Sequence, residues 1–431
     1  MAHPRVPGFR YIVAGMLFLA TTINYADRLM LSVVSPHVRA ELGMSEQDYG
    51  QILFWFMAAY AIMYAASGPI VDRLGTRRGF ALFISIWSAA AMGHALAAGK
   101  WSLTLWRFLL GLGEPGNWPA AAKAVAEWFP ADQRALGVGI FNAGSSMGSA
   151  LAPPVVVFLT LHFGWRTAFL FTGSLGFVWL VAWLVLYQPP HRSKFITAGE
   201  WEYLKDKVRP PGETAPARAP KGDWLRVLRM RECYALVAAR FVSDPVIYFV
   251  IFWLPEYLRK ERAFDLAMIG KYAWVPFIFG DIGYILGGWF SGHLMRKGWP
   301  LARARRFVLF AGAAMMPVTV MSPFVSEAWM AIGLTCVTTF AHALWISNLL
   351  TLPTDFFPGP RVGTATGLSG MGGAVGGMIA NLSTGYVVQA FSYKPVFVVA
   401  GLMHPLAALL LVLLLGRRFR QPEAALKQAD A

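Results

Sequence analysis

The chain has 431 residues, of which 56% are hydrophobic and 14% are charged. A soluble protein carries about 25% charged residues, so the composition excludes an ordinary soluble enzyme and indicates a chain that crosses a lipid bilayer several times. The formal net charge is +15, but the basic residues fall in loops between hydrophobic segments, where they set membrane topology. We therefore expect no nucleic-acid partner.

The sequence shows no pattern of a cofactor or metal site. Cys233 and Cys336 both have apolar neighbours, and their separation suits neither a disulfide framework nor a set of metal ligands. No nucleophile and base stand in a catalytic arrangement, so we predict no enzyme, no catalytic residue, no cofactor and no metal. The first hydrophobic run, from Tyr11, lacks a small-residue cleavage site, and we expect it to remain as a membrane span.

Hydrophobic runs of about 20 residues mark transmembrane helices. We predict twelve of them, over residues 10–34, 48–70, 78–98, 102–127, 135–161, 166–187, 234–257, 268–294, 306–324, 328–350, 362–390 and 394–416. An even number of spans places both termini on one side of the membrane. Lys and Arg residues concentrate in the connections on that side, so the positive-inside rule predicts that both termini are cytoplasmic.

The longest break between hydrophobic runs covers residues 189–232. It opens with Pro189-Pro190, is polar, basic and rich in proline, and indicates a linker with one short surface helix around Ala198–Lys207. It divides the chain into an N-terminal six-helix bundle at 1–188, a cytoplasmic central loop at 189–232 and a C-terminal bundle with its tail at 233–431. Two similar halves around a site at mid-membrane are a recurrent plan of transporters.

Two predicted spans carry buried charges. Asp27 and Arg28 lie in the first span, and Arg107 and Glu114 lie in the fourth. A charge at mid-bilayer costs roughly 3 kcal/mol on insertion scales, and ionisable groups kept there usually line a pathway for an anion, a proton or both. Arg107 and Glu114 are seven residues apart, about two helical turns on one face.

The segment "GPIVDRLGTRR", which follows the second span, resembles the G-x-x-x-D-[RK]-x-G-x-[RK]-[RK] loop of the major facilitator superfamily. Arg107-x-x-x-Gly111 also resembles that superfamily's helix-4 arginine motif. The resemblance implies an all-α membrane protein with twelve transmembrane helices in two pseudo-symmetric six-helix bundles. It also implies a conformational gate rather than a substrate contact for four residues of the loop, which are Asp72, Arg73, Arg77 and Arg78.

Longer stretches resemble the anion:cation symporter family within that superfamily. They include "NYADRLMLSVVSP" and "RFLLGLGEPGNWPA". Among the members of that family, "FNAGSSMGSALAPP" and "FAHALWISNLL" look most like bacterial hexuronate transporters. The resemblance implies a multi-pass protein of the bacterial inner membrane that imports a sugar-acid anion with a proton, and we expect a monomer. Ser145 replaces a glutamine of the aldonate carriers, whereas Asp27 resembles them, so the substrate stays open among hexuronates, aldonates, aldarates and aromatic acids. Antiport and a non-transporting anion sensor also remain open.

Arginine suits a carboxylate because its planar guanidinium donates two parallel hydrogen bonds. We therefore predict Arg107 and Arg28 as ligands of the substrate carboxylate, with a structural arginine bound to carbonyls or to Glu114 as the alternative for Arg107. Neutral polar side chains of the first, second and fifth spans are candidates for the rest of the substrate, with helix packing as their alternative role: Asn24, Tyr60, Tyr64, Asn142 and Ser145.

Glu114 precedes Pro115-Gly116, which breaks the helical hydrogen-bond ladder. A carboxyl group there can load a proton from one side of the membrane and lose it when Arg107 approaches, so we predict Glu114 as the proton-coupling residue, with a permanent ion pair as the alternative. Asp27 is either a second protonation site or the structural partner of Arg28.

The second half offers fewer charges. Arg240 and Asp244 stand four residues apart in the seventh span, where a salt bridge along the helix is the simplest interpretation. Asp281 and His342 have no evident partner in the sequence. They are further candidates for a polar contact with the substrate.

Overall fold

The computed structural model describes residues 8–130, 134–205, 223–357 and 359–416, without the side chains of a few residues, Asp72 among them. The described part of the chain is helical throughout and contains no strand. Its first half comprises α1 (Phe9–Leu42), α2 (Glu46–Leu74), α3 (Thr76–Gly93) with the short turn η1 (His94–Leu96), α4 (Lys100–Gly113), η2 (Glu114–Gly116), α5 (Asn117–Trp128), α6 (Arg134–Phe163) and α7 (Trp165–Leu186).

The second half repeats this plan. It comprises α10 (Arg231–Arg262), α11 (Leu266–Tyr272), α12 (Val275–Arg296), α13 (Leu301–Met315), η4 (Met316–Met321), α14 (Ala328–Leu349), α15 (Leu352–Phe356), α16 (Gly359–Ala390) and α17 (Lys394–Leu415). Between the halves lie η3 (Pro190–Arg192), α8 (Ala198–Lys205) and α9 (Asp223–Arg229). Each predicted span coincides with one of these helices or with a consecutive pair of them, and α8 confirms the predicted surface helix.

Nine helical stretches of the described residues are long and apolar enough to cross a membrane. The other three predicted spans coincide with α1, with α4 and α5, and with α16. The first two carry the buried charges Arg28 and Arg107, and α16 is rich in glycine. These three helices therefore line the interior rather than face lipid along their whole length.

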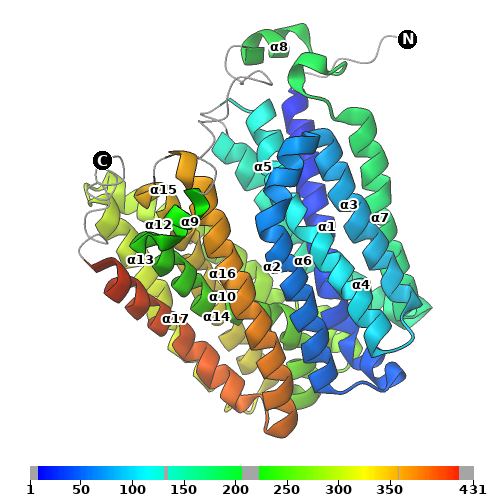
Figure 1. Cartoon of the computed structure of the whole chain (residues 1–431). Coiled ribbons are helices and arrows are strands. Elements are labelled where there is room, and N and C mark those ends of the chain that lie inside the picture. The colour runs from blue at the N-terminus through cyan, green and yellow to red at the C-terminus, as the bar shows by residue number, and fades with distance from the viewer. Residues whose placement is uncertain (1–7, 131–133, 206–222, 358, 417–431) are drawn as a thin grey trace.

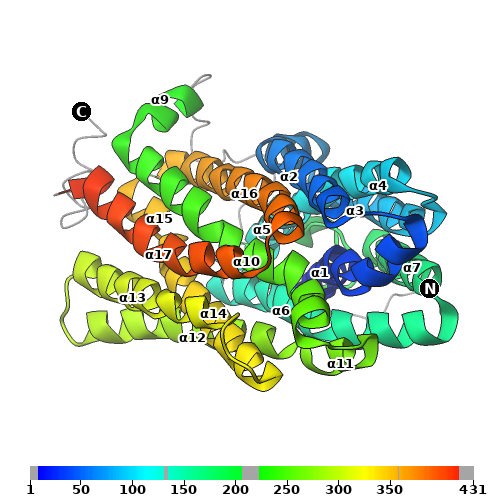
Figure 2. The ribbon, with the colours of Figure 1, turned by 90° about the horizontal axis from the view of Figure 1, so that it is seen from below.

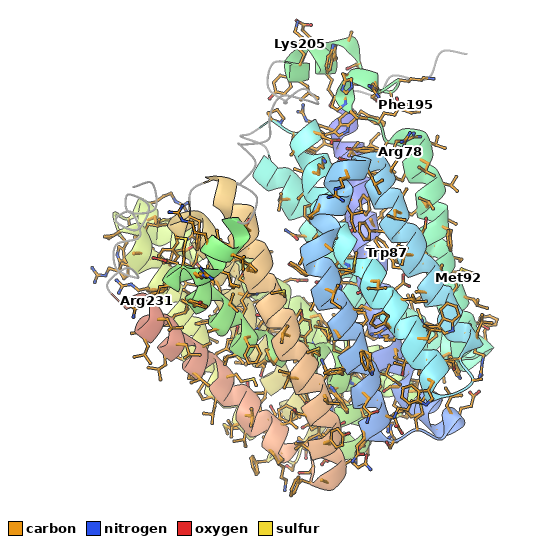
Figure 3. The ribbon with its side chains drawn as sticks, viewed as in Figure 1. Arg78, Trp87, Met92, Phe195, Lys205 and Arg231 are labelled. Carbon is orange, nitrogen blue, oxygen red and sulfur yellow. The ribbon has the colours of Figure 1, made fainter. Side chains whose placement is uncertain are left out.

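The two halves form separate groups of helices that meet along α2 with α16 and α1 with α10 (Figures 1 and 2). We call the end of the molecule that carries the start of α1 and α8 the α8 end. The opposite end carries the end of α1, the start of α2 and the end of α10, and we call it the far end. Figure 3 labels Arg78, Phe195 and Lys205, which lie together at the α8 end.

Close contact between glycines brings α2 and α16 together at the far end. A Cβ atom built on Gly50 would lie 3.2 Å from the Cα atom of Gly385, and one built on Gly385 would lie 2.8 Å from the Glu46 carbonyl oxygen. Larger side chains at these two positions would force the helices apart. Small residues permit such backbone contact between membrane helices.

Helix α8 docks on the start of α1. The Glu200 carboxylate accepts hydrogen bonds from the backbone N–H groups of Phe9 at 2.8 Å and Arg10 at 3.3 Å. The Phe9 ring stacks on Phe195, with ring centroids 5.4 Å apart. A carboxylate at a helix N-terminus satisfies free N–H groups and interacts favourably with the helix dipole. The first part of the central segment is therefore attached to the N-terminal half.

This docking predicts a local stability effect. Glu200→Ala should lower the free energy of unfolding of the N-terminal half by roughly 1–2 kcal/mol, because it leaves two N–H groups of α1 without a partner. The measurement is the melting temperature of the purified protein in detergent. Glu202→Ala is the matched control, since Glu202 is 68% exposed and pairs with Lys205 on the same helix, and it should leave the melting temperature unchanged.

Candidate functional site

The centre of the candidate site is a buried ion pair between α1 and the break in the fourth span. The break is the turn η2, which begins at Glu114 and contains Pro115, and it confirms the predicted interruption of that span. The Arg28 Nε atom donates to Glu114 Oε2 at 2.8 Å, and the two side chains are 4% and 0% exposed. The pair joins residues 86 positions apart.

Polar and aromatic groups surround the Arg28 guanidinium. Its Nη2 atom donates to Asn24 Oδ1 at 3.4 Å and to the Tyr60 hydroxyl at 3.3 Å. Its Cζ atom lies 4.6 Å from the ring centroid of Tyr25 and 4.8 Å from that of Tyr60. Trp118 Nε1 also donates to the Tyr60 hydroxyl at 3.3 Å. The predicted residues Asn24, Arg28, Tyr60 and Glu114 therefore form one cluster.

Two aromatic members of this cluster are absent from the predicted set of site residues. Tyr25 precedes Arg28 by one helical turn, and its ring meets the Trp118 ring edge to face with centroids 6.4 Å apart. An aromatic residue three positions before a buried arginine is a signal that could have identified Tyr25. Trp118 gives no such signal, because its contact with Tyr60 arises from helix packing.

Arg107 is fully buried and contacts the cluster through the backbone of Arg28. Its Nη2 atom donates to the Arg28 carbonyl oxygen at 2.7 Å, and its Cζ atom lies 4.5 Å from the Phe56 ring and 5.8 Å from the Phe252 ring. Its Nε and Nη1 atoms have no hydrogen-bond partner within the described residues. Glu114 therefore pairs with Arg28 rather than with Arg107.

Asp27 occupies a different surface of α1. Its side chain is 1% exposed, and within the part of the chain that the structure describes its two carboxylate oxygens have no hydrogen-bond partner and make no ion pair. Adjacent residues of a helix point about 100° apart, so Asp27 and Arg28 do not pair with each other. The structure therefore shows no ion pair between Asp27 and Arg28 among the described residues.

The remaining candidates lie around this cluster. Asn142 and Ser145 are one turn apart on α6, where the Ser145 hydroxyl donates to the Asn142 carbonyl oxygen at 2.7 Å. The Tyr64 ring packs at an angle against the Tyr60 ring, on the side of the second half, with ring centroids 5.8 Å apart. The Tyr64 and Arg240 side chains both lie next to Gly370 of α16. Arg240 pairs with Asp244 at 2.7 Å, as the sequence predicts. The described contacts do not link Asn142 or Ser145 to Arg28.

The predicted gate loop lies at the α8 end. Arg73 and Arg78 are exposed, and Arg77 donates to the Leu184 carbonyl oxygen on α7. The side chain of Asp72 lies outside the described residues. A partly buried glutamate of α5 that was not predicted also anchors the loop: Glu127 accepts from the Thr76 hydroxyl at 2.5 Å and from the Tyr187 hydroxyl at 2.5 Å.

Ion pairs join the two halves at the far end. Glu256 of α10 is fully buried and accepts hydrogen bonds from Arg39 of α1 and from Arg259 at 2.8 Å. Lys260 pairs with Glu46 at 2.9 Å, and the Tyr49 hydroxyl donates to the Phe252 carbonyl oxygen at 2.8 Å. The halves are therefore bound to each other on the side of the candidate site that faces the far end. The sequence analysis missed this network, although Glu256 stands as an acid inside a predicted span.

Comparisons with known proteins agree with this architecture. The family profile of the Major Facilitator Superfamily matches residues 17–304 and 298–430. A hexuronate transporter of Escherichia coli is 32% identical over 94% of this chain and 94% of its own length. A galacturonate transporter of Dickeya chrysanthemi is 34% identical over 75% of this chain and 95% of its own length. A D-galactonate transporter of Escherichia coli is 28% identical over 94% of this chain and 96% of its own length.

The fold has a counterpart among solved structures. A bacterial homologue of the human lysosomal transporter Spinster, in an inward-facing and unoccupied conformation, superposes with a TM-score of 0.74 at 18% identity, covering 97% of this chain and 98% of its own. That likeness concerns the fold alone. The profile match and the relatives establish the family and exclude an enzyme. The chain is a multi-pass membrane transporter that belongs to the Major Facilitator Superfamily.

Proposed function

We propose that this protein imports a sugar-acid anion together with a proton, by alternating access of a site centred on Arg28. One observation carries the proposal: a fully buried carboxylate, Glu114, neutralises an arginine that aromatic and amide groups already surround. A buried ion pair gains little stability over an apolar pair of similar size. A functional role therefore best explains the presence of the Arg28–Glu114 pair. The pair can exchange its internal carboxylate for that of a substrate.

Charge balance supplies the coupling. Around the candidate site, the N-terminal half holds the buried arginines Arg28 and Arg107 and the buried acids Asp27 and Glu114. With both acids ionised the four charges cancel, and an anion gains nothing by entering. Protonation of Glu114 leaves Arg28 without its counter-charge, and a carboxylate can then replace it at low cost. Substrate and proton therefore favour each other's binding, which is the thermodynamic requirement for symport.

The ion pairs at the far end support a state in which the site is closed on that side. We propose that the far end is periplasmic and that the α8 end is cytoplasmic, as the distribution of basic residues predicts. The two moving bodies are the bundles 1–188 and 233–431, and the segment 189–232 joins them. The protein lies in the bacterial inner membrane with both termini in the cytoplasm, and it acts as a monomer because each chain contains a complete pair of bundles.

Hexuronates are the proposed substrates because the hexuronate and galacturonate transporters share 32% and 34% of their aligned residues with this chain. A thermal-shift screen of the purified protein tests this choice against gluconate, galactonate, glucarate and simple aromatic acids. A ligand stabilises the state that it binds by RT ln(1 + [L]/Kd), so glucuronate or galacturonate should raise the melting temperature most. A shift with an aromatic acid alone would contradict the proposed substrate class.

Two conservative substitutions test the carboxylate ligands. Arg28→Lys and Arg107→Lys keep a positive charge but lose the planar fork, so each should weaken hexuronate binding by roughly 2 kcal/mol, which is about thirtyfold. Binding is measured by calorimetry on the purified protein. Arg73→Lys, an exposed arginine of the gate loop, is the control and should bind normally. Unchanged affinity in Arg28→Lys would remove the basis of the proposed site.

A further inference from the structure

The middle of α12 carries an acid that faces the first half of the protein. Asp281 Oδ1 accepts a hydrogen bond from the Ser146 hydroxyl of α6, so the contact crosses from one half to the other. The Asp281 side chain is half-buried, and its second oxygen, Oδ2, has no donor within the described residues. Ser146 directly follows the candidate substrate residue Ser145.

The described residues place no cation within ion-pair distance of Asp281. Ser146 is the side chain that acts on it, and the ion pairs of the described residues do not include it. The neighbouring arginine of the second half is already neutralised, because Asp244 Oδ2 accepts from Arg240 Nε at 2.9 Å and from Arg240 Nη2 at 2.7 Å. Of these three residues of the second half, Asp281 is therefore the one whose charge has no described partner.

Asp281 is connected to the arginine cluster through the packing of α6 on α1. A Cβ atom built on Gly148, two residues after Ser146, would lie 2.9 Å from the Tyr25 Cβ atom. The Tyr25 ring in turn covers the Arg28 guanidinium, 4.6 Å from its Cζ atom. Helix α6 therefore contacts both the aromatic cover of the arginine, through Gly148 and Tyr25, and the acid of the second half, through Ser146.

We propose that Asp281 determines the class of sugar acid that this protein accepts, by binding hydroxyl groups at the end of the substrate remote from its carboxylate and by repelling a second carboxylate there. The inference rests on the proposed function, because it takes the first carboxylate to be held by the arginines. It assigns the protein to monocarboxylic sugar acids and against aldarates.

The chemistry of a carboxylate explains both effects. An ionised carboxylate accepts hydrogen bonds but cannot donate them, so it suits the hydroxyl groups of a sugar, and such charge-assisted bonds are roughly twice as strong as neutral ones. A diacid bound at Arg28 would bring its second negative charge toward Asp281. Specificity of this kind depends on a repulsive group as much as on an attractive one. Asp281 supplies both properties with one side chain.

Gluconate and glucarate form a matched pair of probes, because they differ only in a hydroxymethyl group or a carboxylate at the far carbon. The wild-type protein should bind gluconate at least about tenfold more tightly than glucarate, since like charges placed together in an interface are strongly unfavourable. Asp281→Asn should weaken gluconate binding by about three- to tenfold, through loss of charge-assisted bonds, and strengthen glucarate binding. The ratio of the two dissociation constants, measured by calorimetry, is the readout.

Two further variants separate this role from a structural one. Ser146→Ala removes the cross-half hydrogen bond but keeps the acid, so it should retain the wild-type ratio. Asp265→Asn removes a charge from the N-cap of α11, where asparagine also caps, and it should change neither constant. If Ser146→Ala and Asp281→Asn change the ratio equally, Asp281 only joins α6 to α12 and the inference is wrong.

The remaining outcomes of these measurements also test the inference. An unchanged ratio in Asp281→Asn, with glucuronate and gluconate still bound by the wild type, overturns the inference and leaves the proposed function intact. Wild-type protein that binds none of the sugar acids contradicts the proposed function itself. An equal loss of affinity for both probes in Asp281→Asn would assign the residue to packing and would also overturn the inference.

Discussion

Glu114→Gln should abolish the accumulation of hexuronate against its gradient while substrate binding is retained. Glutamine resembles the protonated carboxyl group, so Arg28 stays free for the substrate, but no proton can be released on the inner side. We expect binding within about threefold of wild type, because the neutral side chain keeps its place beside Arg28 and loses only a partner that the substrate would replace. The measurement is uptake into proteoliposomes under an imposed pH gradient.

Exchange of labelled for unlabelled substrate is the internal control for this variant. Exchange requires the site to alternate between the two sides but requires no net movement of protons, so Glu114→Gln should still catalyse it. Accumulation at the wild-type level by this variant would transfer the coupling role to Asp27, Asp244 or Asp281. Binding without exchange or uptake by the wild type, under every gradient, would favour an anion sensor.

Glu256→Gln should release the far end of the molecule. Glu256 is fully buried and neutralises Arg39 and Arg259, so its loss leaves two arginine side chains without a counter-charge at the contact between the halves. Removal of one partner from a buried ion pair costs about 3–5 kcal/mol. That amount exceeds the few kcal/mol that separate the two states of a typical switching protein, so the opposite state should become the more populated one.

Hydrogen exchange detects this change without a label. In Glu256→Gln, the ends of α1 and α10 should exchange faster than in wild type, and the gate loop around Arg77 should exchange more slowly. Glu46→Gln is the matched control: Lys260, its partner, is 39% exposed at the rim of the same interface, and a pair of this kind contributes about 0–1 kcal/mol. Equal effects of the two variants would show that burial of Glu256 has no special importance.

The positions of the membrane helices could be predicted because hydrophobic length alone determines them. The spans that differ most are those in which polar residues interrupt the hydrophobic run. Helix α1 continues to Leu42, two turns beyond the predicted end at residue 34, since Pro36 is accommodated inside it and Arg39 is buried against Glu256. A polar residue that is satisfied by another helix looks, in sequence, like the end of a span.

The members of the site could be predicted, but their pairing could not. Arg28, Arg107 and Glu114 are recognisable because a charge in a hydrophobic run is costly. The seven-residue spacing suggests a pair between Arg107 and Glu114, yet the turn η2 starts at Glu114 and the carboxylate meets Arg28 of α1. Which helix approaches that turn depends on packing between distant segments, and neither periodicity nor spacing contains that information.

The glycine contact between α2 and α16 is a point about which α2 can tilt. From Gly50 to the end of α2 at Leu74 the helix is about 36 Å long, at 1.5 Å per residue, so a tilt of about 10° at the contact moves the gate loop by about 6 Å. The backbones approach each other closely there because no side chain stands between them. A protein that must open widely at one end can therefore do so while its other end hardly moves.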